Sequence, residues 1–243
     1  MSIKTDDRGT VTHCFRCGYT AAENRIDRDR SIVTSISEHR TEHNGFSPFA
    51  RDIWRRTEPL AGTAVGYLRA RGLAVPPKDS DLRWLPALRH PVDGFEGPAL
   101  VALIRNAITC KPMSLHRTWI RSDGSKRGTP PRLLLKGHAK IGGVIMLWPS
   151  EAVTHGLAVA EGIETALAAA HVHTPVWSLI DAGNLAQFPV LNGIDALTIF
   201  ADHDNAGINA AKSVAASWRA AGREVRVLMP RTEGHDIADE AVA

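Results

Sequence analysis

After Pro149 the sequence alternates between short apolar runs and segments of helical spacing, and no other feature restricts the possible fold as strongly. Four apolar runs have the length and composition of β-strands, namely 157–160, 176–180, 196–201 and 224–229. Residues 162–171 lie between the first two runs and residues 205–221 between the last two, both with apolar positions at helical spacing. Strands that alternate with helices form a mostly parallel sheet with helices on its faces. We therefore predict an α/β domain for residues 151–243.

Two of these predicted strands end in carboxylates. Glu161 directly follows the first strand, and Asp202 and Asp204 follow the third. Functional groups of such sheets gather beyond the carboxyl ends of the strands, and strand alternation would point Asp202 and Asp204 the same way. Neighbouring carboxylates repel each other unless a cation lies between them, and Mg²⁺ prefers oxygen ligands. The pattern predicts a divalent-metal site, although an N-cap explains Asp204 equally well, and a favourable helix-dipole position explains Glu164.

The sequences around these acids resemble the two signature motifs of Toprim domains, which occur in bacterial primases, type IA and II topoisomerases and some nucleases. Residues 159–168 read Val-Ala-Glu-Gly-Ile-Glu-Thr-Ala-Leu-Ala, and residues 199–207 read Ile-Phe-Ala-Asp-His-Asp-Asn-Ala-Gly. Both are similar to the motifs of plasmid- and phage-type primases, in which a primase-like domain precedes the Toprim domain. Four upstream segments are similar to stretches of that preceding domain, namely 66–73, 81–84, 115–119 and 123–126.

The resemblance implies a role for each acid by its position in the motifs. Glu161 would be the general acid or base, and Asp202 and Asp204 would be ligands of Mg²⁺ or Mn²⁺. Residues 234–240 resemble the acidic motif that follows the Toprim core in primases, where Asp236 would add a metal contact. An acidic start of a C-terminal helix explains that segment equally well.

Charge is distributed unevenly along the chain. Residues 1–150 contain 24 Lys and Arg against 14 Asp and Glu, a net charge of +10, whereas residues 151–243 contain 5 against 12, a net charge of −7. A basic region that binds a polyanion and an acidic region that binds metal fit this division, and a solvated basic surface fits it as well.

The resemblance implies that residues 45–150 form a smaller α+β primase-like domain. We predict that its basic run contacts template and nucleotide through Arg117, Arg121, Lys126, Arg127, Arg132, Lys136 and Lys140.

Residues 1–44 are polar, and we expect a partial zinc-ribbon remnant followed by a linker. Cys14 and Cys17, in a Cys-x-x-Cys sequence, resemble the second half of a primase zinc ribbon. A structural zinc site needs four ligands, and the first pair is missing, so we expect no bound zinc. A rival set would complete the site with His39 and His43, although its spacing exceeds that of common zinc fingers.

Composition also bears on the cellular compartment. The apolar stretches are far shorter than a membrane span, and the N-terminus lacks the apolar core of a signal peptide. Three cysteines do not form a disulfide framework. We therefore expect a cytoplasmic protein that makes no membrane contact.

The predicted function is Mg²⁺-dependent primer synthesis from nucleoside triphosphates on a single-stranded DNA template. The chain has no Gly-x4-Gly-Lys-Ser/Thr sequence, so a replicative helicase would be a separate partner. Two alternatives remain open from the sequence. One is a Toprim nuclease that cleaves nucleic acid with Mg²⁺ or Mn²⁺, and the other is a nucleic-acid-binding accessory protein whose site is catalytically idle.

Overall fold

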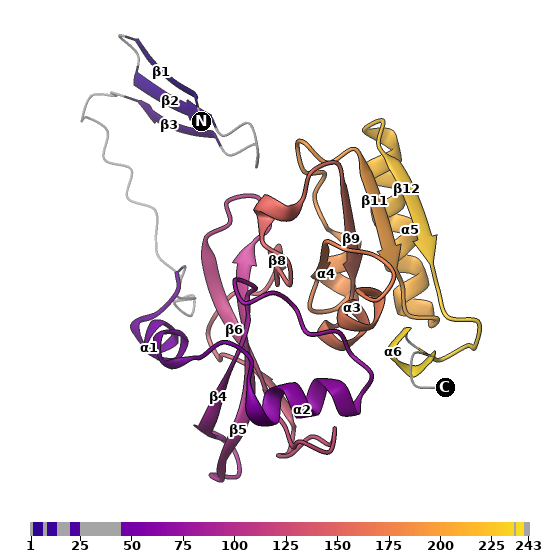
Figure 1. The fold of residues 1–243 in the computed structure, drawn as a ribbon. Coiled ribbons are helices and arrows are strands. Elements are labelled where there is room, and N and C mark those ends of the chain that lie inside the picture. The colour runs from indigo at the N-terminus through magenta and orange to yellow at the C-terminus, as the bar shows by residue number, and fades with distance from the viewer. Residues whose placement is uncertain (1, 7–8, 14–19, 25–44, 236, 241–243) are drawn as a thin grey trace, which may run out of the picture.

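The structure is a computed structural model, and it describes residues 2–6, 9–13, 20–24, 45–235 and 237–240 (Figure 1). The predicted ligands Cys14, Cys17 and Asp236, and the alternative zinc ligands His39 and His43, lie outside the described residues. Strands β1 (Ser2–Asp6), β2 (Gly9–His13) and β3 (Thr20–Asn24) pair as an antiparallel sheet in that order. Within the described residues, no helix is both long enough and apolar enough to cross a membrane.

Two helices follow β3 along the chain. Helix α1 (Pro48–Arg56) begins where the side chain of Ser47 accepts the N–H of Ala50, and a proline at its first position has the backbone angle that a helix needs. Helix α2 (Gly62–Ala70) follows and buries Tyr67 and Leu68 against the sheet described next. Both helices are short, so their burial against the sheet stabilises them more than their own propensity does.

The first large sheet is antiparallel and is buried on both faces. Its strands are β4 (Leu82–Arg89), β5 (Glu96–Asn106), β6 (Pro112–Trp119) and β7 (Arg132–Leu134) in that order, with β8 (Gly143–Val144) also paired to β5. Alternate residues of β5 point to opposite faces, so Leu100 and Ala102 belong to one cluster and Val101 and Leu103 to another. The second cluster includes Ile53 of α1, which covers that face.

The second sheet is parallel throughout and has the order β10-β9-β11-β12. The strands and the helices between them are, in chain order, the 3-10 turn Ser150–Ala152, β9 (Gly156–Ala160), α3 (Ile163–Ala169), β10 (Val176–Ser178), α4 (Ala182–Ala186), β11 (Ala196–Phe200), α5 (Asn205–Ala220), β12 (Glu224–Leu228) and α6 (Ile237–Glu240). From β9 the chain moves to one side, to β10, and it then crosses to β11 on the other side. The crevice between β9 and β11 is therefore the topological switch point, where open α/β sheets bind ligands. The predicted fold class, an α/β part behind a smaller α+β part, is confirmed.

Helices cover both faces of the parallel sheet because alternate strand residues are apolar on both sides. Leu157 and Val159 of β9 pack in one cluster with Val214 and Trp218 of α5. Ala158 and its neighbours on the opposite face pack in another cluster, which contains residues of α3. Figure 1 shows α5 lying along one side of β11 and β12, with α3 beside β9.

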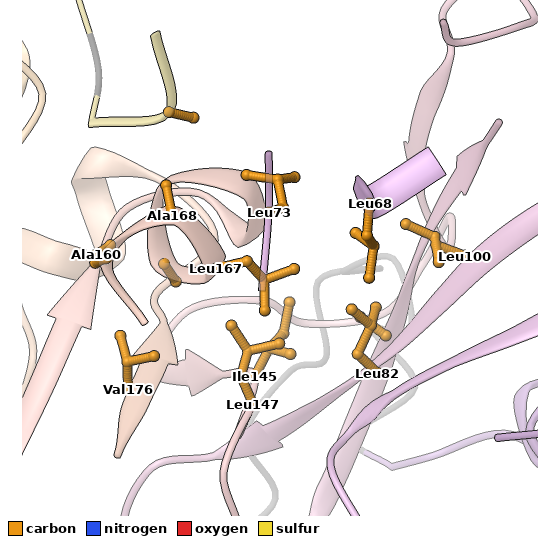
Figure 2. Packing of buried hydrophobic residues seen from close by; sticks show 14 of the residues in the cluster. Leu68, Leu73, Leu82, Leu100, Ile145, Leu147, Ala160, Leu167, Ala168 and Val176 are labelled. Carbon is orange, nitrogen blue, oxygen red and sulfur yellow. The ribbon is translucent and has the colours of Figure 1, made fainter. Parts of the chain in front are cut away.

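A shared core joins the antiparallel and parallel sheets. In Figure 2, Leu82 and Leu100 of the first sheet and Val176 of the second contribute to one apolar cluster, with Ile145 between them. The backbone of Ile145 also exchanges two hydrogen bonds with Ser178 of β10, with N···O distances of 2.8 and 3.0 Å. The segment that follows β8 thus joins the two sheets. It holds the antiparallel sheet against the carboxyl end of the parallel sheet.

Candidate functional site

Two predicted acids meet at the switch point of the parallel sheet. Ala160 of β9 lies opposite Phe200 of β11, so Glu161 and Asp202 both leave the carboxyl edge from adjacent strands. Both side chains line one cavity of about 150 Å³. The antiparallel sheet forms the wall that faces them, through residues of β5, β6 and β7.

Asp204 is the N-cap of α5. Its Oδ1 accepts the N–H of Gly207 at 2.7 Å, and its side chain is exposed, so the N-cap alternative is confirmed. Strand alternation does not apply to Asp202 and Asp204, because β11 ends at Phe200 before either of them. Asp202 lines the cavity. Asp204 does not line it, but its negative charge is one of the causes that raise the pKa of Glu161, after burial.

Gly207 holds the acidic loop against the start of α5. A Cβ atom at this position would lie 2.5 Å from the backbone oxygen of Asp202 and 3.1 Å from its nitrogen. Only glycine permits so close an approach of the helix to that backbone. The sequence analysis assigned Gly207 no role, although a glycine three residues after the capping Asp204 was the available signal.

The environment of Glu161 raises the pKa of its carboxyl. Partial burial raises the pKa of its carboxyl, and the charges of Asp204 and Asp181 raise it further, while a hydrogen bond from the backbone N–H of Ala182 opposes the rise. Carboxylates that crowd one another in this way are the arrangement that a divalent cation stabilises, because it favours their ionised forms.

Asp181 is a third strand-end acid, which the sequence analysis did not identify. It follows β10 as the N-cap of α4, where it accepts the N–H of Asn184 at 3.0 Å, and the ammonium of Lys140 donates to it at 2.6 Å. The preceding Ile180 has a φ of 75°, a left-handed conformation that β-branched residues rarely adopt. An acid just beyond the predicted strand 176–180 was the missed signal. Its partner Lys140 lies in the loop between β7 and β8, so the pair joins this loop to the start of α4.

Glu164 has a larger role than helix capping. Its carboxylate accepts hydrogen bonds from Lys126 and Arg132, both at 2.8 Å, and from the hydroxyl of Tyr67. Arg71 completes the group with an ion pair at 3.2 Å. Two of the predicted nucleic-acid contacts, Lys126 and Arg132, are therefore held by an internal acid.

The other members of the basic run differ in exposure. Arg117 is buried, and its guanidinium donates to the backbone oxygen of Leu134 at 3.1 Å, which leaves little of it for a ligand. Arg121, Arg127 and Lys136 are exposed. The structure thus divides the run into cations that hold the fold together and cations that face solvent.

His116 of β6 also lines the cavity, together with Thr118 two residues later on the same face of the strand. Burial lowers the pKa of His116 to about 4, and the nearby charge of Arg132 lowers it as well, so the ring is neutral at pH 7. Its Nδ1 is enclosed and has no hydrogen-bond partner among the described residues. The sequence analysis treated this histidine only as part of a segment similar to primases.

The donor set suits a hard divalent cation that keeps part of its water shell. Within the described ranges, no three His, Cys, Asp or Glu side chains lie close enough to enclose a metal ion together. Mg²⁺ commonly binds through one or two carboxylates, substrate phosphates and water, so Glu161 and Asp202, which both line the cavity, fit such an ion.

Two family models match parts of the chain. Residues 156–243 match the family model of the Toprim domain, and residues 45–146 match that of a domain of unknown function, DUF7146. No curated protein matches the chain.

Several solved structures are similar to the chain, each with a TM-score below 0.5. One is a DNA primase domain from Pseudomonas aeruginosa, at 15% identity and a TM-score of 0.44, covering 72% of this chain and 66% of that one. Another is the zinc-binding and RNA polymerase domains of the Aquifex aeolicus primase, at 17% identity and 0.46, covering 72% and 51%. A third comes from the bacteriophage T7 lagging-strand DNA polymerase with primase domains, at 17% identity and 0.41, covering 76% and 85%. The chain therefore spans about two thirds of the first of these structures and about half of the second. The parallel sheet with its acidic edge, and the family match over the same residues, identify residues 156–243 as a Toprim domain.

Proposed function

We propose that the protein catalyses Mg²⁺-dependent nucleotidyl transfer on a single-stranded DNA template, as in primer synthesis. The observation that carries the proposal is the cavity in which Glu161 and Asp202 of the Toprim edge face Arg132 of the antiparallel sheet. An acidic side suits metal-bound phosphate, and a basic side suits the remaining phosphates of a nucleotide or template.

In the proposed reaction, a 3′-hydroxyl attacks the α-phosphorus of a nucleoside triphosphate. A new phosphorus–oxygen bond forms, the bond to the bridging oxygen of the β-phosphate breaks, and pyrophosphate leaves. Glu161 would accept the proton of the attacking hydroxyl, and Asp202 and Asp204, with Asp236, would hold the metal. When bound, a divalent cation neutralises the negative charge that develops on the phosphates.

The test is a product assay with the full chain. The protein is incubated with single-stranded DNA, Mg²⁺ and labelled ribo- or deoxynucleoside triphosphates, and the products are separated on a denaturing gel. We expect new oligomers, and we expect Glu161→Gln and Asp202→Asn to lower their yield at least about 100-fold. Asp195→Asn is the matched control, because Asp195 pairs with Arg223 at the opposite, amino-terminal end of β11.

Each other outcome would overturn part of the proposal. Shortened DNA without added nucleotides would identify a nuclease, and a gel shift without chemistry would identify a nucleic-acid-binding accessory protein. Normal product from Glu161→Gln or Asp202→Asn, with circular dichroism like that of the unmodified protein, would refute the assignment of the site.

A further inference from the structure

The carboxylate of Glu164 is the centre of a cluster that joins α3 to the antiparallel part of the chain. Tyr67 donates a hydrogen bond to Oε1, and three cations share Oε2. The nitrogen–oxygen distances are 3.2 Å for Arg71, 2.8 Å for Lys126 and 2.8 Å for Arg132. The Glu164 side chain is only 13% exposed. These five residues are called the Glu164 cluster below.

The Glu164 cluster carries more positive charge than its carboxylate can balance. Burial would raise the pKa of Glu164, but the hydrogen bonds from Lys126 and Tyr67 outweigh it and lower the pKa, so this group is ionised. One negative charge then faces three cations. Burial also lowers the pKa of Lys126, as does the charge of Arg132, which shows that Glu164 only partly compensates that ammonium. A partly buried excess of two positive charges favours an anion at the same place.

The three cations also have more hydrogen-bond donors than Glu164 uses. A guanidinium has five N–H groups and an ammonium has three. The Nε of Arg71 is enclosed and lacks a hydrogen-bond partner among the described residues. Arg132 is half-exposed and lines the cavity beside Glu164, so its remaining donors are accessible to a molecule that enters.

We propose that Glu164 is a positioning residue that holds Arg71, Lys126 and Arg132 as a preformed site for the phosphate groups of a nucleoside triphosphate. The inference rests on the proposed function and adds to it how the substrate is oriented. Glu161 and Asp202 line the same cavity from the Toprim edge. A triphosphate would therefore extend from the acidic side, where its α-phosphorus reacts, to the Glu164 cluster, which holds the leaving phosphates. Arginine suits this role because its planar fork matches phosphate oxygens.

Binding of inorganic pyrophosphate, measured by calorimetry in EDTA, tests the site without metal, template or turnover. Pyrophosphate and ATP should both bind, and orthophosphate should bind more weakly than pyrophosphate. Lys126→Gln and Arg132→Gln should each weaken the binding of pyrophosphate at least about tenfold, a loss of about 1.4 kcal/mol. Lys212→Gln is the matched control, because it removes the same charge from an exposed position on α5.

Glu164→Gln separates positioning from simple charge attraction. The substitution makes the protein more positive by one charge, so attraction alone would tighten pyrophosphate binding. If Glu164 positions the cations, the affinity for pyrophosphate should instead fall at least about tenfold. The KM for nucleotide should rise by a larger factor than kcat falls. Equal or tighter binding in Glu164→Gln would refute the positioning role. If this variant does not fold, unchanged binding in Lys126→Gln and Arg132→Gln would refute the site.

The two proposals fail in different ways. Pyrophosphate binding without oligomer synthesis would leave the phosphate site standing and overturn the proposed function. Oligomer synthesis whose KM for nucleotide is unaffected by Lys126→Gln and Arg132→Gln would keep the function and refute the Glu164 cluster as its phosphate site.

Discussion

The acidic and basic walls of the cavity are assembled in different ways. On the acidic side, Glu161 and Asp202 each follow the end of a strand within two residues, so the local sequence places them. On the basic side, Arg132 lines the cavity and reaches Glu164 across 32 residues of sequence. A strand end can be located along the chain, but the partner of a long cationic side chain depends on which segments pack together.

The ion pairs between the two regions also change what the uneven charge along the chain indicates. A basic region before an acidic one suggested a polyanion site beside a metal site. In the structure, Lys126 and Arg132 are paired with Glu164, and Lys140 is paired with Asp181, across the junction of the two sheets. Part of the charge difference therefore holds the junction together, and only part of it faces solvent.

The largest expected effect comes from breaking the core that holds both walls in place. Leu167 of α3 is fully buried in the cluster shared by the two sheets (Figure 2). Leu167→Ala should lower the free energy of unfolding by about 3 kcal/mol through the cavity it leaves. Urea denaturation followed by fluorescence measures the loss. A loss below about 1 kcal/mol would mean that the two sheets do not depend on a common core.

The acidic wall can be disturbed without touching the basic wall. In Gly207→Ala, the new methyl group would meet the backbone of Asp202 at 2.5 Å, so we expect a loss of about 2 kcal/mol and displacement of that acid. Urea denaturation and the product assay measure the two effects. Gly156→Ala is the control, because its methyl group would have an ordinary contact at 3.8 Å. Unaltered activity in Gly207→Ala would contradict the role assigned to this close approach.

The basic wall contains one group that should respond to pH. The pKa of His116 is about 4 in the folded protein, against 6.5 for an ordinary histidine, so between these values only the unfolded chain takes up the proton. The stability from the neutral ring is therefore present above about pH 6.5 and is lost as the pH falls toward 4. We expect His116→Phe to reduce the stability lost over this window by about 2 kcal/mol.

Urea denaturation across the same pH range measures that difference. His155→Gln provides the control, because its side chain is 87% exposed. An equal pH dependence in His116→Phe and the unmodified protein would show that other groups cause the acid sensitivity.

The smallest expected effect concerns the half-exposed ion pair of Lys140 with Asp181. The side chains of Lys140 and Asp181 are 47% and 32% exposed, so solvent screens their attraction. Lys140→Gln should cost about 0.5 kcal/mol, and added salt should diminish the difference. Arg55→Gln, which removes a still more exposed pair with Asp52, is the comparison. A loss above about 2 kcal/mol would show that the junction depends on this single contact.

The sequence alone determined the parallel sheet and the position of its acids. Apolar runs that alternate with helical segments allow few other folds, and Glu161 and Asp202 come directly after two of these runs. Because parallel strands present their carboxyl ends at one edge, placing these acids required no knowledge of distant contacts. The Toprim resemblance rested on the same local motifs, and the family match over residues 156–243 confirms it.

Only the tertiary structure decided how the remaining charges are used. Arg117 is buried, Lys126 and Arg132 are held by Glu164, and the neighbouring cations of the run are exposed, although all appear alike along the chain. The physical reason is that a side chain's partner and burial depend on segments distant in sequence, whereas the end of a strand is a property of the strand itself.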